Sequence, residues 1–104
     1  MIEALATFMF TLVYVNQVDE DTQFFPKKDK HMNFLFTSIS FGIFVLIAYP
    51  ISGGCLNPAI GFSICFVDLF KTGSGNEVKF VWIYLIFPLI GGLLAIMVFE
   101  CCYK

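Results

Sequence analysis

The chain has 104 residues, of which 59% are hydrophobic and 13% are charged, and its net charge is −2. Soluble domains carry about 25% charged residues, so this composition excludes an ordinary soluble domain and favours a single membrane domain. All six basic residues are lysines and they form no basic stripe, so no nucleic-acid partner is expected.

The first apolar segment covers residues 1–16 and contains one charged residue, Glu3. It is slightly short for a membrane span, which needs about 20 residues. A signal peptide is the alternative, but the segment has no basic start and no small-x-small cleavage site before the acidic residues that follow. We therefore interpret it as a span that is truncated at its N-terminus.

A polar loop at residues 17–32 leads to a second apolar segment at 33–51, which is long enough to cross a bilayer. We expect this helix to end at Pro50, because proline removes a helical hydrogen bond and clashes with the preceding turn. The next apolar run, at 59–70, is too short to cross a membrane as a helix. A turn rich in glycine and serine follows it at 71–77.

The last apolar segment, at residues 80–103, is the third predicted span. Its small residues Gly91, Gly92 and Ala95 would let a neighbouring helix approach closely. The sequence thus predicts an all-α, multi-pass integral membrane protein with three transmembrane helices and one half-length helix. Lysines are more numerous on the side of the 17–32 loop and the C-terminus, so this side is predicted to be cytoplasmic.

Asn57 and Pro58 predict the start of the short helix, in the middle of the most apolar half of the chain. Asn is a strong N-cap residue, and Pro is favoured at the first helical position. A helix that begins inside the membrane points its positive end at the bilayer interior, which disfavours cations and protons. Irregular backbone before it, at 52–56, is tolerated there only when it is buried in protein or lines a water-filled cavity. These features indicate a re-entrant, pore-lining half-helix, and an ordinary N-capped helix in a loop is the alternative.

Four features resemble the aquaporin and glycerol-facilitator family, the major intrinsic proteins. Three are local sequences: EALATFMFTLV at 3–13, SGGCLNPAIGF at 52–62, and WIYLIFPLIGGLLAIMVFE at 82–100. The fourth is their order and spacing, and the pair Pro88 and Gly91 is more similar to the second repeat of the family than to the first. The resemblance implies that residues 1–104 form the second repeat, half of an inverted-repeat bundle, with the pore loop and half-helix at 52–70.

The resemblance assigns roles to individual residues along the solute path. Asn57 would donate a hydrogen bond to the passing solute. Glu3 would support the pore loop by accepting backbone N–H bonds, because an intramembrane carboxylate is costly and normally partnered. A position of Glu3 at the level of the lipid headgroups is the alternative. The other residues that the resemblance places on the path are Gly53, Gly54, Cys55, Pro58 and Ala59.

The selectivity constriction falls, by the resemblance, on Val45, Gly54 and Ile60. Most family members carry an arginine where Ile60 stands, although some plant vacuolar members carry an aliphatic residue there. This chain contains no arginine at all, so the filter would lack its main fixed donor and positive charge. We therefore expect passage of water and of small neutral solutes such as glycerol, urea or ammonia. Tyr84 is similar to water channels and Leu85 to glycerol channels, which leaves the preferred solute open.

The predicted function is a passive channel for water and small neutral solutes, here as a half-channel or fragment that needs another repeat. That complementary first repeat would come from the same full-length chain or from another copy, and the family is usually a homo-tetramer in membrane lipid. A non-conducting membrane adaptor or assembly protein is the alternative. No enzymatic activity is expected, because the chain has a single histidine, His31, and no catalytic set. The four cysteines show no C-x-x-C spacing, so neither a metal site nor a cofactor is expected.

Overall fold

The computed structural model describes residues 1–25, 28–76 and 78–104. The elements in chain order are α1 (Ile2–Val18), α2 (Lys30–Ser52), α3 (Pro58–Thr72), the short 3-10 helix η1 (Val78–Phe80) and α4 (Val81–Tyr103). No described residue lies in a strand, so the expected all-α class is confirmed. The polar loop at 17–32 and the turn at 71–77 are described only in part.

The end of α2 differs from the sequence prediction, since the helix continues through Pro50 to Ser52. Proline removes only its own N–H from the helical ladder, so the residues after it can still complete the last turn. The helix ends instead at Gly53, which has a φ of +89° and donates its N–H to the carbonyl of Tyr49 at 3.0 Å. A glycine in the left-handed region is a common helix stop, because it lacks the Cβ that disfavours that conformation.

The start of α3 follows the prediction from Asn57 and Pro58. The Oδ1 atom of Asn57 accepts a hydrogen bond from the Ala59 N–H at 2.9 Å, and Pro58 occupies the first helical position. The helix runs two residues beyond the predicted 59–70 run and stops at Gly73, whose φ is +61°. Local capping signals therefore define both ends of α3.

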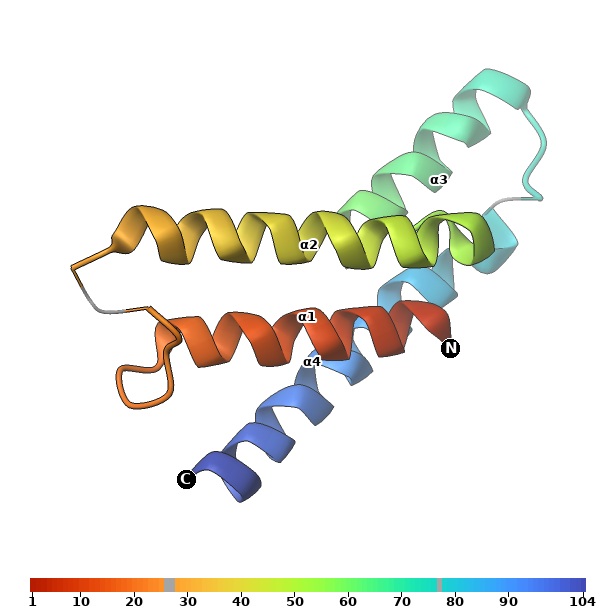
Figure 1. Cartoon of the computed structure of the whole chain (residues 1–104). Coiled ribbons are helices and arrows are strands. Elements are labelled where there is room, and N and C mark those ends of the chain that lie inside the picture. The colour runs from red at the N-terminus through yellow and green to blue at the C-terminus, as the bar shows by residue number, and fades with distance from the viewer. Residues whose placement is uncertain (26–27, 77) are drawn as a thin grey trace.

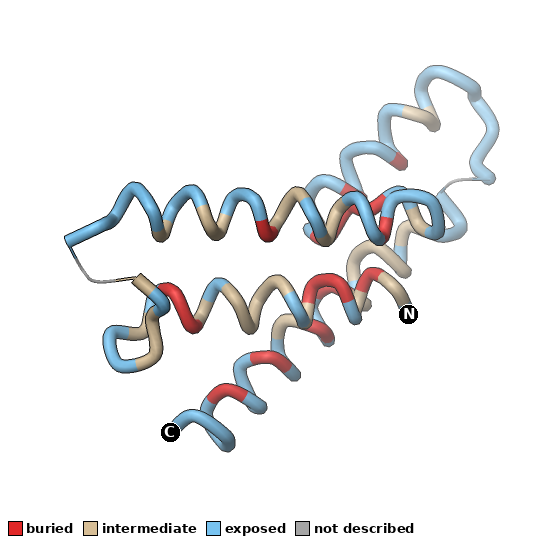
Figure 2. Tube along the Cα trace, viewed as in Figure 1, coloured by how far each residue is buried: buried red, intermediate tan, exposed pale blue. Residues whose placement is uncertain are grey.

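The helices are arranged around the oblique crossing of α1 and α4 (Figure 1). α1 and α2 run antiparallel side by side, and α4 packs obliquely against α1. Within the described residues, α3 packs against α4 and η1 and makes no such contact with α1 or α2. Most buried positions accordingly lie where α1 meets α4 and α2 (Figure 2).

The crossing of α1 and α4 is built on small residues. A Cβ atom at Gly91 would overlap the carbonyl oxygen of Ala4, and Ala95 one turn later is fully buried. A Cβ at Gly92 would lie 3.9 Å from Thr11 Oγ1, which is ordinary van der Waals contact. The predicted close approach of a neighbouring helix is thus confirmed at Gly91, whereas Gly92 does not require it.

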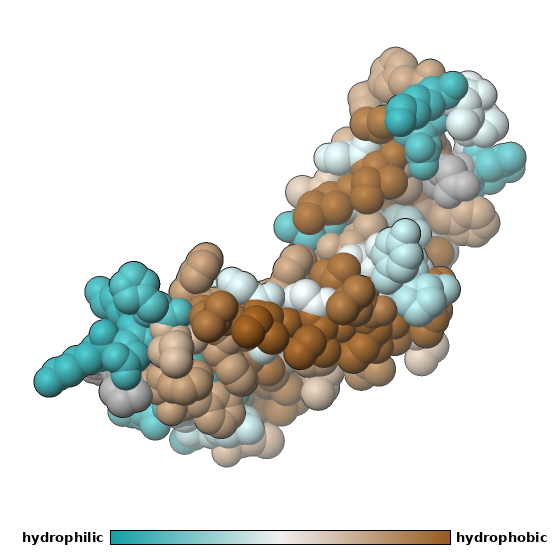
Figure 3. All heavy atoms as spheres, turned by 45° about the horizontal axis from the view of Figure 1, so that its top comes forward, coloured by the Kyte–Doolittle hydropathy of each residue, from teal (hydrophilic) through white to brown (hydrophobic). Residues whose placement is uncertain are grey.

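Most large apolar side chains point outward from the bundle. α2 and the segment Val78–Tyr103 are long and apolar enough to cross a membrane. Only 11% of the most apolar stretch of α2 and 17% of that of Val78–Tyr103 is buried within the molecule. A core helix of a soluble protein would bury such residues. Figure 3 shows a hydrophobic surface between hydrophilic regions at the two ends of the molecule. This surface suits contact with lipid or with another membrane-embedded element.

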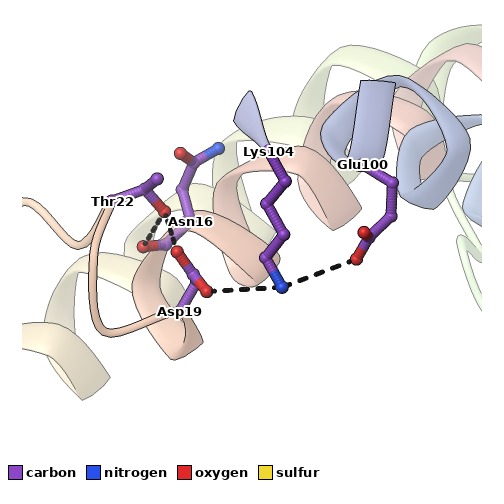
Figure 4. A network of polar contacts seen from close by, with 5 residues as sticks. All are labelled: Asn16, Asp19, Thr22, Glu100 and Lys104. Carbon is purple, nitrogen blue, oxygen red and sulfur yellow. Dashed lines mark hydrogen bonds and ion pairs between the residues drawn. The ribbon is translucent and has the colours of Figure 1, made fainter. Parts of the chain in front are cut away.

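A small polar network joins the C-terminal ends of α1 and α4 (Figure 4). Lys104 Nζ lies 3.8 Å from the Asp19 carboxylate and 3.6 Å from that of Glu100. Thr22 donates its hydroxyl proton to Asp19 at 3.0 Å and folds the loop against the end of α1. Exposed ion pairs contribute about 0–1 kcal/mol each, so this network orients the ends more than it stabilises the fold.

Candidate pore loop and its supports

The loop between α2 and α3 turns back along α2. Gly53, Gly54 and Leu56 all have positive φ values, of +89°, +62° and +49°. A Cβ atom at Gly54 would lie 2.6 Å from the carbonyl oxygen of Val45 and 3.1 Å from the backbone nitrogen of Tyr49. The loop backbone therefore lies directly on the last turns of α2, and only glycine fits at position 54.

Glu3 holds this loop from the first turn of α1. Its side chain is 1% exposed, and its carboxylate accepts the Cys55 N–H at 3.1 Å and the Leu56 N–H at 2.8 Å. The hydroxyl of Ser52 also donates to Glu3 Oε1. The N–H groups of Cys55 and Leu56 lie outside any helix, so this one side chain supplies the acceptor that a helix would otherwise provide. Hydrogen bonds to a carboxylate are roughly twice as strong as neutral ones.

Leu56 is held on several sides, which offsets its left-handed backbone. Such a conformation costs a non-glycine residue about 1–3 kcal/mol and persists only where the surroundings impose it. The Leu56 side chain is buried against Ala6 and Ala48, and its carbonyl accepts a long hydrogen bond from Thr7 Oγ1 at 3.4 Å. Sequence reasoning missed Thr7, although Glu3 and Thr7 stand one helical turn apart in an apolar segment, a spacing that places them on one face.

Ser52 and Tyr84 form a second support that sequence reasoning also missed. The Tyr84 hydroxyl, on α4, donates to the backbone carbonyl of Ser52 at 2.7 Å. The Ser52 hydroxyl lies 3.4 Å from the Gly54 N–H, which donates to it. Sequence spacing carries no signal for the Tyr84 contact, because the two residues belong to different helices and are 32 positions apart.

The residues expected on the solute path fall into a buried and an exposed group. The structure brings Gly54 and Val45 into contact, and it buries Gly54 and Cys55. Cys55 lines a cavity of about 230 Å³ together with Cys65, a residue that the sequence did not link to it. The positions exposed at the start of α3 and in the loop are Gly53, Asn57, Ala59 and Ile60, with Pro58 half-buried.

Asn57 presents a donor at the exposed N-terminal end of α3. Its Oδ1 atom is engaged by the Ala59 N–H, and its Nδ2 group has no protein partner among the described residues. The dipole of α3 adds partial positive charge at this point. No group of three or more His, Cys, Asp or Glu side chains in the described parts of the chain is placed to hold a metal ion.

Comparison with known proteins gives the family of the chain. The model of the major intrinsic protein family matches residues 1–99. The chain belongs to the major intrinsic protein family. Its similarity to this family, inferred from the sequence motifs, is thereby confirmed.

Two curated members of the major intrinsic protein family illustrate the relationship. The chain is 30% identical to "Glycerol uptake facilitator protein-like 6" of Lactiplantibacillus plantarum, over 90% of this chain and 39% of that protein. It is 33% identical to "Probable aquaporin TIP2-2" of Oryza sativa subsp. japonica, over 99% of this chain and 38% of that protein. The chain therefore spans less than two fifths of the length of these relatives. No solved structure matches it.

Membership of the major intrinsic protein family settles two coarser predictions. The family and the two long apolar helices make this chain an integral membrane protein. Members of the family are channels and not enzymes, which confirms the expected absence of an enzymatic activity.

Proposed function

We propose that this chain forms one half of a transmembrane channel for water and small neutral solutes. In this proposal α1, α2 and α4 cross the membrane and α3 is a re-entrant half-helix, so that residues 1–104 act as a second repeat. The carrying observation is the loop that Glu3 holds against α2, because it delivers Asn57 to an exposed helix start. The similarity to a named glycerol uptake facilitator and a probable aquaporin supports the kind of solute.

The exposed polar backbone argues for a partner that completes the pore. Gly53 and Asn57 are both exposed, on a molecule that also exposes many large apolar side chains. Irregular polar backbone is tolerated at membrane depth only where it is buried in protein or lines a water-filled cavity, so we propose that a second repeat covers this region and leaves a water-filled path. We propose that this complementary repeat comes from the same longer chain or from a second copy. Completed channels would assemble as homo-tetramers in lipid.

The proposed constriction consists of Val45, Gly54 and Ile60. Contact between Val45 and Gly54 supports their part in one narrow region, and Ile60 is exposed on the first turn of α3. An aliphatic side chain at position 60 offers no hydrogen bond and no charge to a solute. We therefore propose that glycerol, urea or ammonia can pass as well as water.

Solute flux tests the half-channel. The chain is reconstituted in liposomes alone and together with a first repeat of a major intrinsic protein, and swelling is recorded in water and glycerol gradients. We expect flux when the complementary repeat is present, because only then is the polar loop covered on both sides. Stable insertion of the pair without any solute flux would contradict the channel and favour the non-conducting adaptor.

Substitution of Ile60 tests the constriction. We expect Ile60→Arg to reduce glycerol flux about tenfold while water flux changes less, because an arginine adds bulk and positive charge to the path. A tenfold change corresponds to a difference of about 1.4 kcal/mol in free energy. The matched control is Ile60→Val, which keeps a neutral aliphatic side chain and should leave the solute ratio unchanged. Equal glycerol flux in the arginine variant and the wild type would remove Ile60 from the constriction.

A further inference from the structure

We propose that Tyr84 is a positioning residue that sets the constriction by holding both the pore loop and the start of α3. The inference rests on the proposed channel function. Tyr84 lies in the first turn of α4, outside the proposed constriction itself. Two independent contacts of one side chain carry the argument.

The first contact fixes the start of the pore loop. The Tyr84 hydroxyl donates to the carbonyl oxygen of Ser52 at 2.7 Å, and Ser52 is the last residue of α2. The next residue, Gly53, has a φ of +89° and no atom within 4 Å of the place where a Cβ would stand. Glycine has the greatest backbone freedom and no side chain here to restrain it. The hydrogen bond to Ser52 therefore limits rotation of the Ser52–Gly53 peptide, with which the loop begins.

The second contact fixes the start of α3. A Cβ atom at Gly61 would overlap the Cβ of Tyr84, so α3 and α4 approach each other as closely as glycine allows. Gly61 directly follows Ile60. The position of Tyr84 thus determines how far Ile60 stands from α4, just as its hydroxyl determines where the loop before Gly54 begins.

Ser52 lies between two supports on different helices. Its hydroxyl donates to Glu3 on α1, while its carbonyl accepts from Tyr84 on α4. Removal of the Tyr84 hydroxyl would leave the Glu3 support and the Gly61 contact in place. Tyr84→Phe therefore removes the hydroxyl that donates to Ser52 and keeps the same ring on α4.

The first arm of the experiment measures loop opening without any flux. In a protein whose remaining thiol is Cys55, made by Cys65→Ala, Cys101→Ser and Cys102→Ser, we measure the rate of maleimide labelling in liposomes. Cys55 is 7% exposed, so labelling requires the loop to open. We expect Tyr84→Phe to raise the rate about two- to tenfold, the range that loss of one ordinary hydrogen bond gives. An unchanged rate would overturn the proposal.

The control and the second arm use the same liposomes. Tyr103→Phe, which removes an exposed hydroxyl from the same helix, should leave the labelling rate unchanged. With the complementary repeat present, Tyr84→Phe should change the ratio of glycerol to water permeability at least twofold, and Tyr103→Phe should not. An unchanged ratio in a conducting protein would overturn the link to the constriction. Faster labelling of Tyr84→Phe without flux in any form, wild type included, would support the loop contact and reject the channel function instead.

Discussion

Glu3 takes the place of regular secondary structure for the loop between α2 and α3. The N–H groups of Cys55 and Leu56 belong to no helix, and both reach the carboxylate of Glu3. Their burial excludes water as a substitute partner. A carboxylate is well suited to this task because it offers several acceptor sites to converging donors.

Replacement of Glu3 should therefore destabilise the loop strongly. We expect Glu3→Ala to lower the free energy of unfolding by about 3 kcal/mol, since it leaves buried backbone donors without an acceptor. Denaturation of the detergent-solubilised protein, followed by circular dichroism, measures the change.

The control for this prediction is Glu100→Ala at the other end of the chain. The Glu100 side chain is 58% exposed and pairs with Lys104, so the substitution should change stability by about 0.5 kcal/mol or less. A loss of equal size in both variants would show that Glu3 has no special role in the loop.

At the scale of elements, small residues decide how closely the helices approach. Gly91 lets the backbone of α4 meet the backbone of α1 at Ala4, and Gly61 lets α3 meet α4 at Tyr84. In a membrane such contacts stabilise the bundle through van der Waals packing. Lipid tails are as apolar as the side chains, so the hydrophobic effect does not drive the helices together there. A single methyl group at either crossing must push two helices apart.

The crossing of α1 and α4 can be tested with a pair of matched alanine substitutions. We expect Gly91→Ala to destabilise the protein by about 1–3 kcal/mol, because the new methyl group overlaps the carbonyl of Ala4. Gly42→Ala, in α2, meets no atom within 4 Å and should be neutral or stabilising by about 0.5–1 kcal/mol. Thermal unfolding in detergent compares the two, and equal effects would argue against close packing at Gly91.

On the scale of the whole molecule, the two hydrophilic ends are formed by different segments of the chain. The loop after α1 and the C-terminus meet through Asp19 and Lys104 at one end, while the C-terminal end of α3 and η1 lie away from them (Figures 1 and 4). This arrangement supports the proposal that the 17–32 loop and the C-terminus share one side of the membrane. Lys27, one of the lysines on which the orientation rests, lies outside the described residues.

Membrane orientation can be measured with a thiol reagent that does not cross the bilayer. In intact bacterial spheroplasts, we expect the exposed thiols of Cys101 and Cys102 to be labelled only after permeabilisation, because their end should face the cytoplasm. A variant with Ser74→Cys and without these two thiols should be labelled at once, since the exposed residue Ser74 lies in the turn after α3. The reverse pattern would invert the orientation.

Much of this architecture follows from short-range signals in the sequence. Asn57 and Pro58 predict where α3 begins, because capping and proline geometry act within one turn of a helix. Apolar runs predict the helices, and the sequence itself shows that position 60 carries the uncharged residue Ile60. The prediction that α2 ends at Pro50 was wrong, because a proline near the C-terminal end of a helix does not prevent the last turn from forming. The helix ends at Gly53 instead.

By itself the sequence therefore determines the class, the family and the order of elements, since these depend on composition and on residues a few positions apart. The resemblance implied that Glu3 supports the loop between α2 and α3, but only the tertiary structure decides which backbone groups Glu3 holds and that Thr7 and Tyr84 also hold the loop. The partners of its backbone are Glu3 and Thr7, which are 49 to 53 positions away in the chain, and Tyr84, which is 32 positions away. Such contacts form when packed helices bring distant side chains to one point, and no local pattern in the chain specifies that point.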